Sequence, residues 1–405
     1  MKLFVGIDVS SKDLVTSMIS EETTEVVFHG NFVNDLKGAT ELKNMIIDTA
    51  NSNHLDQVVI GMEATSIYSF HPAMFFQEDS DLKKLNTQSV VIDPKKTKRY
   101  HDVFAEDKND QIDAFYIADF LRVGRYSVGI VRQENYIALQ RLTRSRYELV
   151  QSLARAKQHF IENLYYKLNK LVISDELNTS IFGSTMMSLL TEDMTTDDLL
   201  NLSITDLADY LNEHGRGRFA NPEALAKTIQ KAVRASYRLD KVIANSVDTV
   251  LSVYAEEIKA FQKMIKDLDK AIEKVVQVTD EEQILRSIPG IGPVYAAGIL
   301  AEIGHDNEAK LAKYAGLSWR EKQSGAYASD NTPLKRTGNA YLRYYLVEAA
   351  DRVRIQNPVF GEYYRRKYQE VKHTPSKRAL VLTARKLIRV IFFLLKNHQI
   401  YQEKR

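Results

Sequence analysis

The chain has 405 residues, of which 44% are hydrophobic and 27% are charged, and its formal net charge is +2 at pH 7. This length and apolar content allow two or three domains, each with its own core. The absence of cysteine excludes disulfides, thiolate metal sites and cysteine nucleophiles, and it fits the reducing cytoplasm.

Neither end of the chain has the pattern of a membrane segment. Residues 1–5 lack the long apolar core of a secretory signal peptide. The apolar run at 390–395 is far too short to span a bilayer. We therefore expect a cytoplasmic protein with no membrane partner.

The small net charge conceals an uneven distribution. Residues 331–405 contain 17 Lys and Arg against 5 Asp and Glu, so this region carries +12 and the rest of the chain −10. A basic region beside an acidic one suits an enzyme that handles a polyanion. The alternative is a solvated helical surface without a partner.

The first 125 residues alternate strand and helix patterns. Short β-branched runs predict strands, and longer amphipathic runs predict helices. The predicted strands are 3–9, 14–19, 25–32, 57–63 and 89–93, and the predicted helices are 34–50, 67–85 and 107–121. Three strands followed by helix-strand-helix-strand-helix is the plan of an RNase H-like (RuvC-like) domain, which we assign to residues 1–130.

Four acidic residues in this region form a candidate metal site. Asp8 and Glu63 end predicted strands, whereas Asp110 and Asp113 begin a helix and share one of its faces. Each alone could be a helix cap or a surface acid. Carboxylates brought together repel unless cations neutralise them, and hard oxygen ligands suit Mg²⁺ or Mn²⁺, which serve phosphoryl transfer.

A basic segment follows the fifth predicted strand. Four cations there are interleaved with Tyr100, a pattern that suits contact with a nucleic-acid backbone. The alternative is a solvated loop. The cations are Lys95, Lys96, Lys98 and Arg99.

The middle of the chain is helical and highly charged. Residues 134–172 and 240–278 have apolar residues at helical intervals and predict two long helices in an antiparallel arm or coiled coil. Shorter helices are predicted between them, first acidic (191–209) and then basic (216–238). We assign residues 131–280 to this helical domain.

Residues 281–405 are predicted to form a mainly helical C-terminal domain. Its segment 288–293, Ile-Pro-Gly-Ile-Gly-Pro, resembles a helix-hairpin-helix element, in which Gly290 and Gly292 would let backbone N–H groups approach a phosphate. The alternative is a plain turn between packed helices. Basic amphipathic helices are predicted at 342–353 and 376–395.

Motifs at both ends of the chain carry a resemblance to a known family. They lie at 6–12, 61–68, 91–94, 108–114, 288–304, 314–317, 323–325, 335–339 and 342–343. In these motifs the chain resembles the DEDD-type transposases of bacterial insertion sequences, the IS-one-ten type, which are related to the pilin-gene invertases. It departs from the family at Ser66, where glycine is usual, and at Asp93, where asparagine is usual. Asp93 adds a carboxylate near the site, as a weak metal ligand or a surface group.

The resemblance implies a composite catalytic site. Asp8, Glu63, Asp110 and Asp113 match the metal-binding acids, and Ser324 matches a serine that attacks DNA to form a covalent phosphoserine link. Ser329 is a second candidate for that serine. Lys335, Arg336 and Arg343 could hold phosphates, with surface charge as the alternative, and Gly338 and Asn339 are expected to cap the following helix.

The resemblance also implies partners. These are donor and target DNA, a structured noncoding (bridge) RNA encoded by the element, and further copies of the chain in a homodimer or homotetramer joined through the long helices. We expect the protein to be bacterial and to associate with the nucleoid when it acts. If base pairing selects the sequence, the protein needs no recognition helix.

Three other functions fit part of the pattern. A RuvC-like junction endonuclease would use metal-activated water and no serine. A sugar-kinase or actin-like ATPase would need glycine-rich phosphate loops, which the sequence lacks. A non-catalytic nucleic-acid scaffold would tolerate loss of Asp8 and Glu63.

Overall fold

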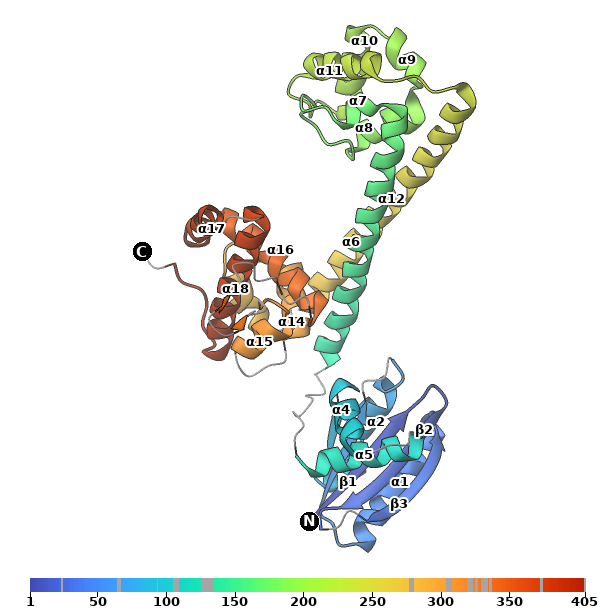
Figure 1. Ribbon diagram of the computed structural model, residues 1–405, viewed down its shortest axis with the longest axis vertical. Coiled ribbons are helices and arrows are strands. Elements are labelled where there is room, and N and C mark those ends of the chain that lie inside the picture. Colours follow the sequence, from blue (N-terminus) through green and yellow to red (C-terminus); the bar gives the residue numbers. More distant parts are fainter. Residues whose placement is uncertain are drawn as a thin grey trace. The chain divides into compact units, whose positions relative to one another are not determined.

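The computed structural model describes two compact units, Met1–Gln133 and Glu134–Arg405 (Figure 1). The residues described are 1–22, 25–63, 67–92, 94–104, 109–124, 134–276, 280–303, 308–318, 323–324, 327–328, 334, 337–371 and 374–403. The fold is mixed α/β and mostly helical. None of the described helices is long and apolar enough to cross a membrane.

The first unit is built on a five-stranded sheet with the order β3-β2-β1-β4-β5. The strands β1, β2 and β3 are antiparallel neighbours, whereas β1, β4 and β5 run parallel. The strands are β1 (Lys2–Val9), β2 (Asp13–Ser20), β3 (Val26–Val33), β4 (Gln57–Glu63) and β5 (Gln88–Ile92). All five predicted strands are confirmed to within two residues at either end.

Helices cover both faces of this sheet. One apolar core joins alternate residues of β1, β2 and β4 to α1 (Leu36–Ser52) and α2 (Phe70–Glu78). A second core, on the opposite face, joins Phe4, Val59 and other strand residues to α5 (Asp110–Arg122). Strands β1 and β4 are therefore buried on both sides, and their polar residues lie at or next to the strand ends.

One helical prediction in this unit is corrected, and the solvated-loop alternative for the basic segment is excluded. The helix predicted at 67–85 is divided into α2 and α3 (Ser80–Lys84), because the Asp79 carboxylate accepts hydrogen bonds from the backbone N–H groups of Asp81 and Leu82 and starts a new helix. The basic segment after β5 is not a loop but the helix α4 (Pro94–Phe104). Proline at its first position is compatible with a helix start.

Two long helices dominate the second unit, α6 (Glu134–Lys167) and α12 (Lys241–Val276) (Figure 1). Arg146 pairs with Asp269, and further along α6 the Lys167 ammonium lies 2.8 Å from the Asp248 carboxylate. Arg146 precedes Lys167 on α6, whereas its partner Asp269 follows Asp248 on α12. The separation along the sequence is the same on both helices. This reversed order is what antiparallel packing requires. The predicted antiparallel arm is confirmed.

Short helices connect the two long ones and enclose a core of their own. Buried leucine, isoleucine and methionine side chains from these helices pack with Phe160 of α6 and Leu251 of α12. The elements are α7 (Asn169–Val172), α8 (Ser184–Ser188), a π-helical turn (Leu189–Asp193), α9 (Thr196–Asn201), α10 (Ile204–Gly215) and α11 (Pro222–Ala235).

The described residues of the C-terminal part form helices and a small two-stranded sheet. Its elements are α13 (Asp280–Arg286), α14 (Pro293–Glu302), α15 (Glu308–Tyr314), β6 (Gln323–Ser324), β7 (Tyr327–Ala328), α16 (Ala340–Gln356), α17 (Pro358–Glu370) and α18 (Pro375–Lys396). Its core includes Leu139 of α6 and Ile272 of α12. Because this core is shared, the division into separate domains at 280 remains a prediction.

Candidate active site

The parallel strands β1 and β4 bring Asp8 and Glu63 to one edge of the sheet. Ile7 pairs with Met62 in the parallel register, so Asp8 and Glu63 follow at the same level. Adjacent strands lie about 4.8 Å apart, so the two acids are neighbours. Both side chains are partly buried.

Two glycines let α5 lie directly against these strands. A Cβ added at Gly6 would lie 2.1 Å from the Ala114 carbonyl oxygen, and one at Gly61 would lie 2.6 Å from the Leu121 side chain. Gly6 and Gly61 are register partners, and each is two residues before an acid. Side chains alternate along a strand, so the acids face α5 as the glycines do. A glycine two residues before an acid occurs in both strands, and this repeated spacing could have indicated from the sequence that a helix lies close to both.

The start of α5 supplies the other two acids. Asn109 caps this helix by accepting a 2.8 Å hydrogen bond from the Ile112 N–H. Asp110 and Asp113 occupy the first turn, where the helix dipole favours negative charge.

Three of the four predicted acids converge. Carboxylate oxygens of Asp8, Asp110 and Asp113 all lie within 4.8 Å of one another. Burial, and then the charges of Asp110, Asp113 and Glu63, raise the pKa of Asp8 to about 6. The cluster therefore fits a hard divalent cation, which would relieve the repulsion that raises this pKa. Glu63 contributes to that electrostatic field.

One neighbour of the cluster was not predicted from the sequence. His101 of α4 places its Nε2 atom 3.4 Å from Asp113 Oδ1, and its ring packs edge-on against Tyr116. The spacing of Thr97, Tyr100 and His101 places all three on one helical face and could have indicated that this face turns inward.

Helix α4 is fastened to α5 and presents basic residues to solvent. The Tyr100 hydroxyl donates a 2.6 Å hydrogen bond to Asp119, which also pairs with Arg122. Lys98 and Arg99 are exposed. Lys95 and Lys96 belong to the first turn of α4, but their side chains, like the whole of Asp93, lie outside the described residues.

The predicted serine lies in the second unit. Ser324 ends β6 and pairs with Tyr327 of β7, so it belongs to a tight antiparallel hairpin. Three other predicted residues, Ser329, Lys335 and Arg336, lie outside the described residues.

The two glycines of the 288–293 turn differ in their surroundings. Gly290 has a φ of +101°, and a Cβ there would lie 2.8 Å from the backbone of Val353 in α16, so its hydrogen is needed for packing. Gly292 caps α14, and a Cβ there would meet open space. A phosphate contact at either glycine stays a prediction, and the space beside the Gly292 Cα is compatible with one.

Sequence comparisons identify the family. A profile of the DEDD transposases of the IS110 type matches residues 5–166, and a profile of the transposase IS116/IS110/IS902 family matches residues 282–365. Together they cover more than half of the chain. The chain belongs to this transposase family.

Relatives from two insertion elements support the assignment. The uncharacterized 42 kDa protein of insertion element IS900 from Mycobacterium paratuberculosis is 29% identical over 307 residues, 73% of each chain. The uncharacterized 44.8 kDa protein of IS116 from Streptomyces clavuligerus is 26% identical over 317 residues, also 73% of each chain. The resemblance inferred from the motifs is confirmed.

Membership of this transposase family implies an enzyme that cuts and rejoins DNA. The matched regions contain the acidic cluster and the Ser324 hairpin. They also contain Asn339, which caps α16 as predicted, and Arg343, whose Nη1 donates to the Ala315 carbonyl. Arg343 thus has a contact within the fold in addition to its predicted role toward phosphate.

Proposed function

We propose that this transposase cuts and rejoins DNA with a divalent-metal site and a serine nucleophile. The metal ligands are Asp8, Glu63, Asp110 and Asp113, and the nucleophile is Ser324. The observation that carries the proposal is the convergence of three carboxylates within 4.8 Å, at the end of a buried strand where unneutralised charge is costly.

The sheet supports an RNase H-like assignment for the first unit. Three antiparallel strands continue into two parallel ones, and the acids lie at the carboxyl ends of β1 and β4. A bound Mg²⁺ or Mn²⁺ would supply Lewis-acid stabilisation of charge on a scissile phosphate. The carboxylates would hold this cation, and the close contacts of α5 with Gly6 and Gly61 keep Asp110 and Asp113 near the sheet.

In the proposed serine chemistry, each step replaces one phosphoester bond with another. The Ser324 hydroxyl loses its proton as its oxygen bonds to phosphorus, and the bond from phosphorus to a deoxyribose oxygen breaks and leaves a strand hydroxyl. The covalent phosphoserine retains the energy of the broken link. A strand hydroxyl from a partner DNA can then reverse the attack and rejoin the strands without another energy source.

Basic residues around both parts suit phosphate contact. The helix α4 beside the acidic cluster carries four of them, Lys95, Lys96, Lys98 and Arg99. Two more, Lys335 and Arg336, follow the serine hairpin in the sequence. We further propose that a structured RNA encoded by the element guides the protein. The active assembly in this proposal is a homodimer or homotetramer. The proposed compartment is the bacterial cytoplasm, at the nucleoid.

Replacing an acid tests the metal site. Asp113→Asn should reduce Mg²⁺-dependent strand cleavage by at least about 1,000-fold, because a ligand charge is lost, while DNA binding measured by mobility shift changes little. Asp48→Asn, an exposed position on α1, is the matched control. Cleavage by Asp113→Asn at the wild-type rate would reject the metal-site assignment.

A second candidate function is a metal-dependent junction endonuclease that uses water. One observation favours this function. The described acidic cluster lies wholly within the first unit, and hydrolysis by metal-activated water at such a cluster would need no serine. Ser324→Ala distinguishes the two mechanisms. A transposase of the proposed kind loses cleavage in this variant, whereas a hydrolytic nuclease retains it.

A further inference from the structure

The second unit contains a fully buried carboxylate that the proposed chemistry does not use. Glu302 ends α14, and its side chain is 0% exposed. A charge removed from water is costly unless it is paired and hydrogen-bonded. Its partners therefore indicate what its burial achieves.

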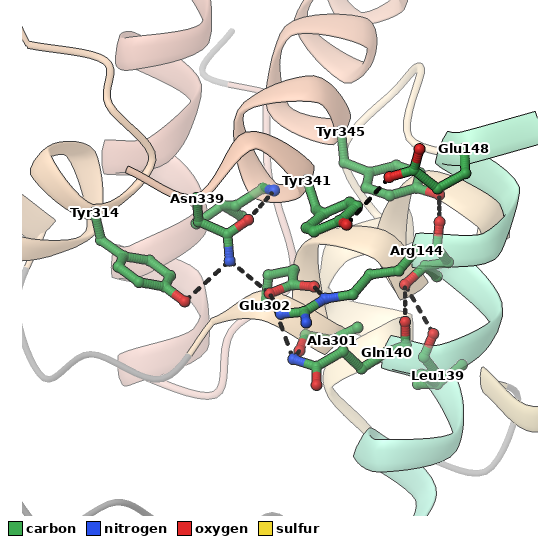
Figure 2. Close-up of polar contacts among 12 residues, drawn as sticks. Leu139, Gln140, Arg144, Glu148, Ala301, Glu302, Tyr314, Asn339, Tyr341 and Tyr345 are labelled. Carbon is green, nitrogen blue, oxygen red and sulfur yellow. Dashed lines mark hydrogen bonds and ion pairs between the residues drawn. The ribbon is translucent and has the colours of Figure 1, made fainter. Parts of the chain in front are cut away.

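The arm supplies one set of partners (Figure 2). Arg144 of α6 donates from Nε to Glu302 Oε1 at 2.7 Å and from Nη2 to Oε2 at 2.9 Å, a two-point contact that fixes orientation. Gln140, one turn earlier on α6, donates to Oε2 at 3.4 Å. The carboxylate is thus held against the long helix.

Asn339 supplies the opposite partner. Its Nδ2 group donates to Glu302 Oε2 at 2.6 Å and to the Tyr314 hydroxyl at 2.9 Å (Figure 2). Its Oδ1 atom accepts from the Leu342 N–H at 3.0 Å and caps α16. One amide side chain therefore links α14, α15 and α16.

These contacts lie where the two ends of a long segment meet. The Asn339 N–H donates to the Tyr314 carbonyl at 2.7 Å. Gly338 has a φ of +138°, and a Cβ there would lie 2.4 Å from the same carbonyl oxygen. Residues 315–338, including Ser324, lie between Tyr314 and Asn339. Holding the two ends of a long segment together has an entropic cost, which contacts of this kind offset.

We propose that Glu302 is a positioning residue for strand cleavage. Held by Arg144 and bonded to Asn339, it fixes the ends of the serine-bearing segment to the arm. We call these three residues the clamp. The inference rests on the proposed role of Ser324 as the nucleophile, and it adds that the placement of this serine depends on α6.

A substitution at Asn339 separates the clamp from the helix cap. Asn339→Asp keeps a side chain that caps helices equally well. It removes the Nδ2 donor, however, and places a second carboxylate against Glu302. We expect the variant to fold, its backbone amide at position 339 to exchange at least about tenfold faster, and its strand cleavage to fall at least about tenfold with nucleic-acid binding unchanged.

A second substitution should reverse this defect in part. In Glu302→Gln/Asn339→Asp, the glutamine amide can donate to the new carboxylate, so this hydrogen bond is restored with its direction reversed and the net charge equals that of the wild type. The same amide group cannot accept from Arg144 Nη2, so Arg144 keeps only the hydrogen bond from its Nε to the remaining oxygen. A merely destabilised fold would not regain slow exchange and cleavage together. We expect both to recover at least about threefold relative to Asn339→Asp, without reaching the wild-type values.

Asn357 provides a matched control. It caps α17, is 0% exposed and donates its amide to the Tyr401 hydroxyl at 3.0 Å, and none of its hydrogen bonds among the described residues involves Glu302, Tyr314 or Asn339. Asn357→Asp should leave cleavage and the exchange at residue 339 unchanged, even if its melting temperature falls.

Hydrogen exchange of peptides covering 337–345, measured together with cleavage, tests the clamp. Wild-type exchange and cleavage in Asn339→Asp, or failure of the double variant to recover either in part, would overturn the inference. Failure of the proposed function is a separate result, because cleavage would then survive Ser324→Ala whatever the exchange data show.

Discussion

At the scale of single residues, the fold brings the acidic side chains of the cluster close enough to repel one another. Asp8 is partly buried and faces three other acids, which is why its pKa is about 6 rather than 3.8. An acid at the end of an apolar strand is common, so the candidate role of Asp8 was predictable only from its occurrence together with Glu63, Asp110 and Asp113 in the order and spacing of the family motifs. The contact of His101 with Asp113 was not predictable, because it depends on how α4 packs against α5.

This repulsion between carboxylates predicts that the stability of the protein depends on pH when divalent ions are absent. The folded-state pKa of Asp8 is raised, so its contribution favours folding below about pH 4 and is lost as pH rises through about 6. Above that pH, Asp8→Asn should melt higher than the wild type, by about 2–4 °C for each kcal/mol of repulsion removed. Thermal melts from pH 4 to 8 in EDTA measure this. An equal melting temperature at pH 8 would show that the repulsion is absent.

At the scale of elements, the strands were easier to predict than the helices. Strand ends followed from β-branched runs, but the break at Asp79 depends on side-chain capping, and α4 depends on contacts such as Tyr100 with Asp119. Helix α17 was missed because its Tyr-rich and Arg-rich sequence has little apolar periodicity. Helix α5 can lie close to the sheet because Gly6 and Gly61 have no Cβ atom.

Gly6 tests this close approach. Gly6→Ala places a methyl group against the backbone of α5 and should destabilise the first unit by about 1–3 kcal/mol, with weaker Mn²⁺ binding as Asp110 and Asp113 move away. Gly292→Ala, where the new Cβ meets open space, is the control. Denaturant unfolding and Mn²⁺ titration measure the two effects. A Gly6→Ala protein as stable as the wild type would contradict the packing described.

At the scale of the whole molecule, sequence periodicity predicted the long antiparallel helices, but the Leu139 and Ile272 contacts that make their base part of the C-terminal core are distant in sequence. Such contacts leave no local pattern. The same is true of the clamp, in which Arg144 and Glu302 are separated by 158 residues. The family motifs marked Glu302 and Asn339 without revealing that they touch.

The arm provides a prediction about charge burial. The Arg146 side chain is 13% exposed and its partner Asp269 is 30% exposed, so Arg146→Ala should leave a partly buried, unpaired carboxylate and destabilise the second unit by about 2–3 kcal/mol. Lys227→Ala breaks an exposed pair with Glu223 and should cost at most about 1 kcal/mol. Denaturant melts of both variants compare the two. Equal effects would contradict the burial of the Arg146 pair.

The joint action of the metal site and the serine is best tested by trapping the covalent intermediate on end-labelled DNA that carries the element's ends, with its RNA present. We expect a denaturation-resistant protein–DNA adduct that maps to the peptide containing Ser324. This adduct should require Mg²⁺ or Mn²⁺ and should be lost in both Ser324→Ala and Asp113→Asn. Cleavage without any adduct, or an adduct that persists in Ser324→Ala or in EDTA, would refute the proposed chemistry.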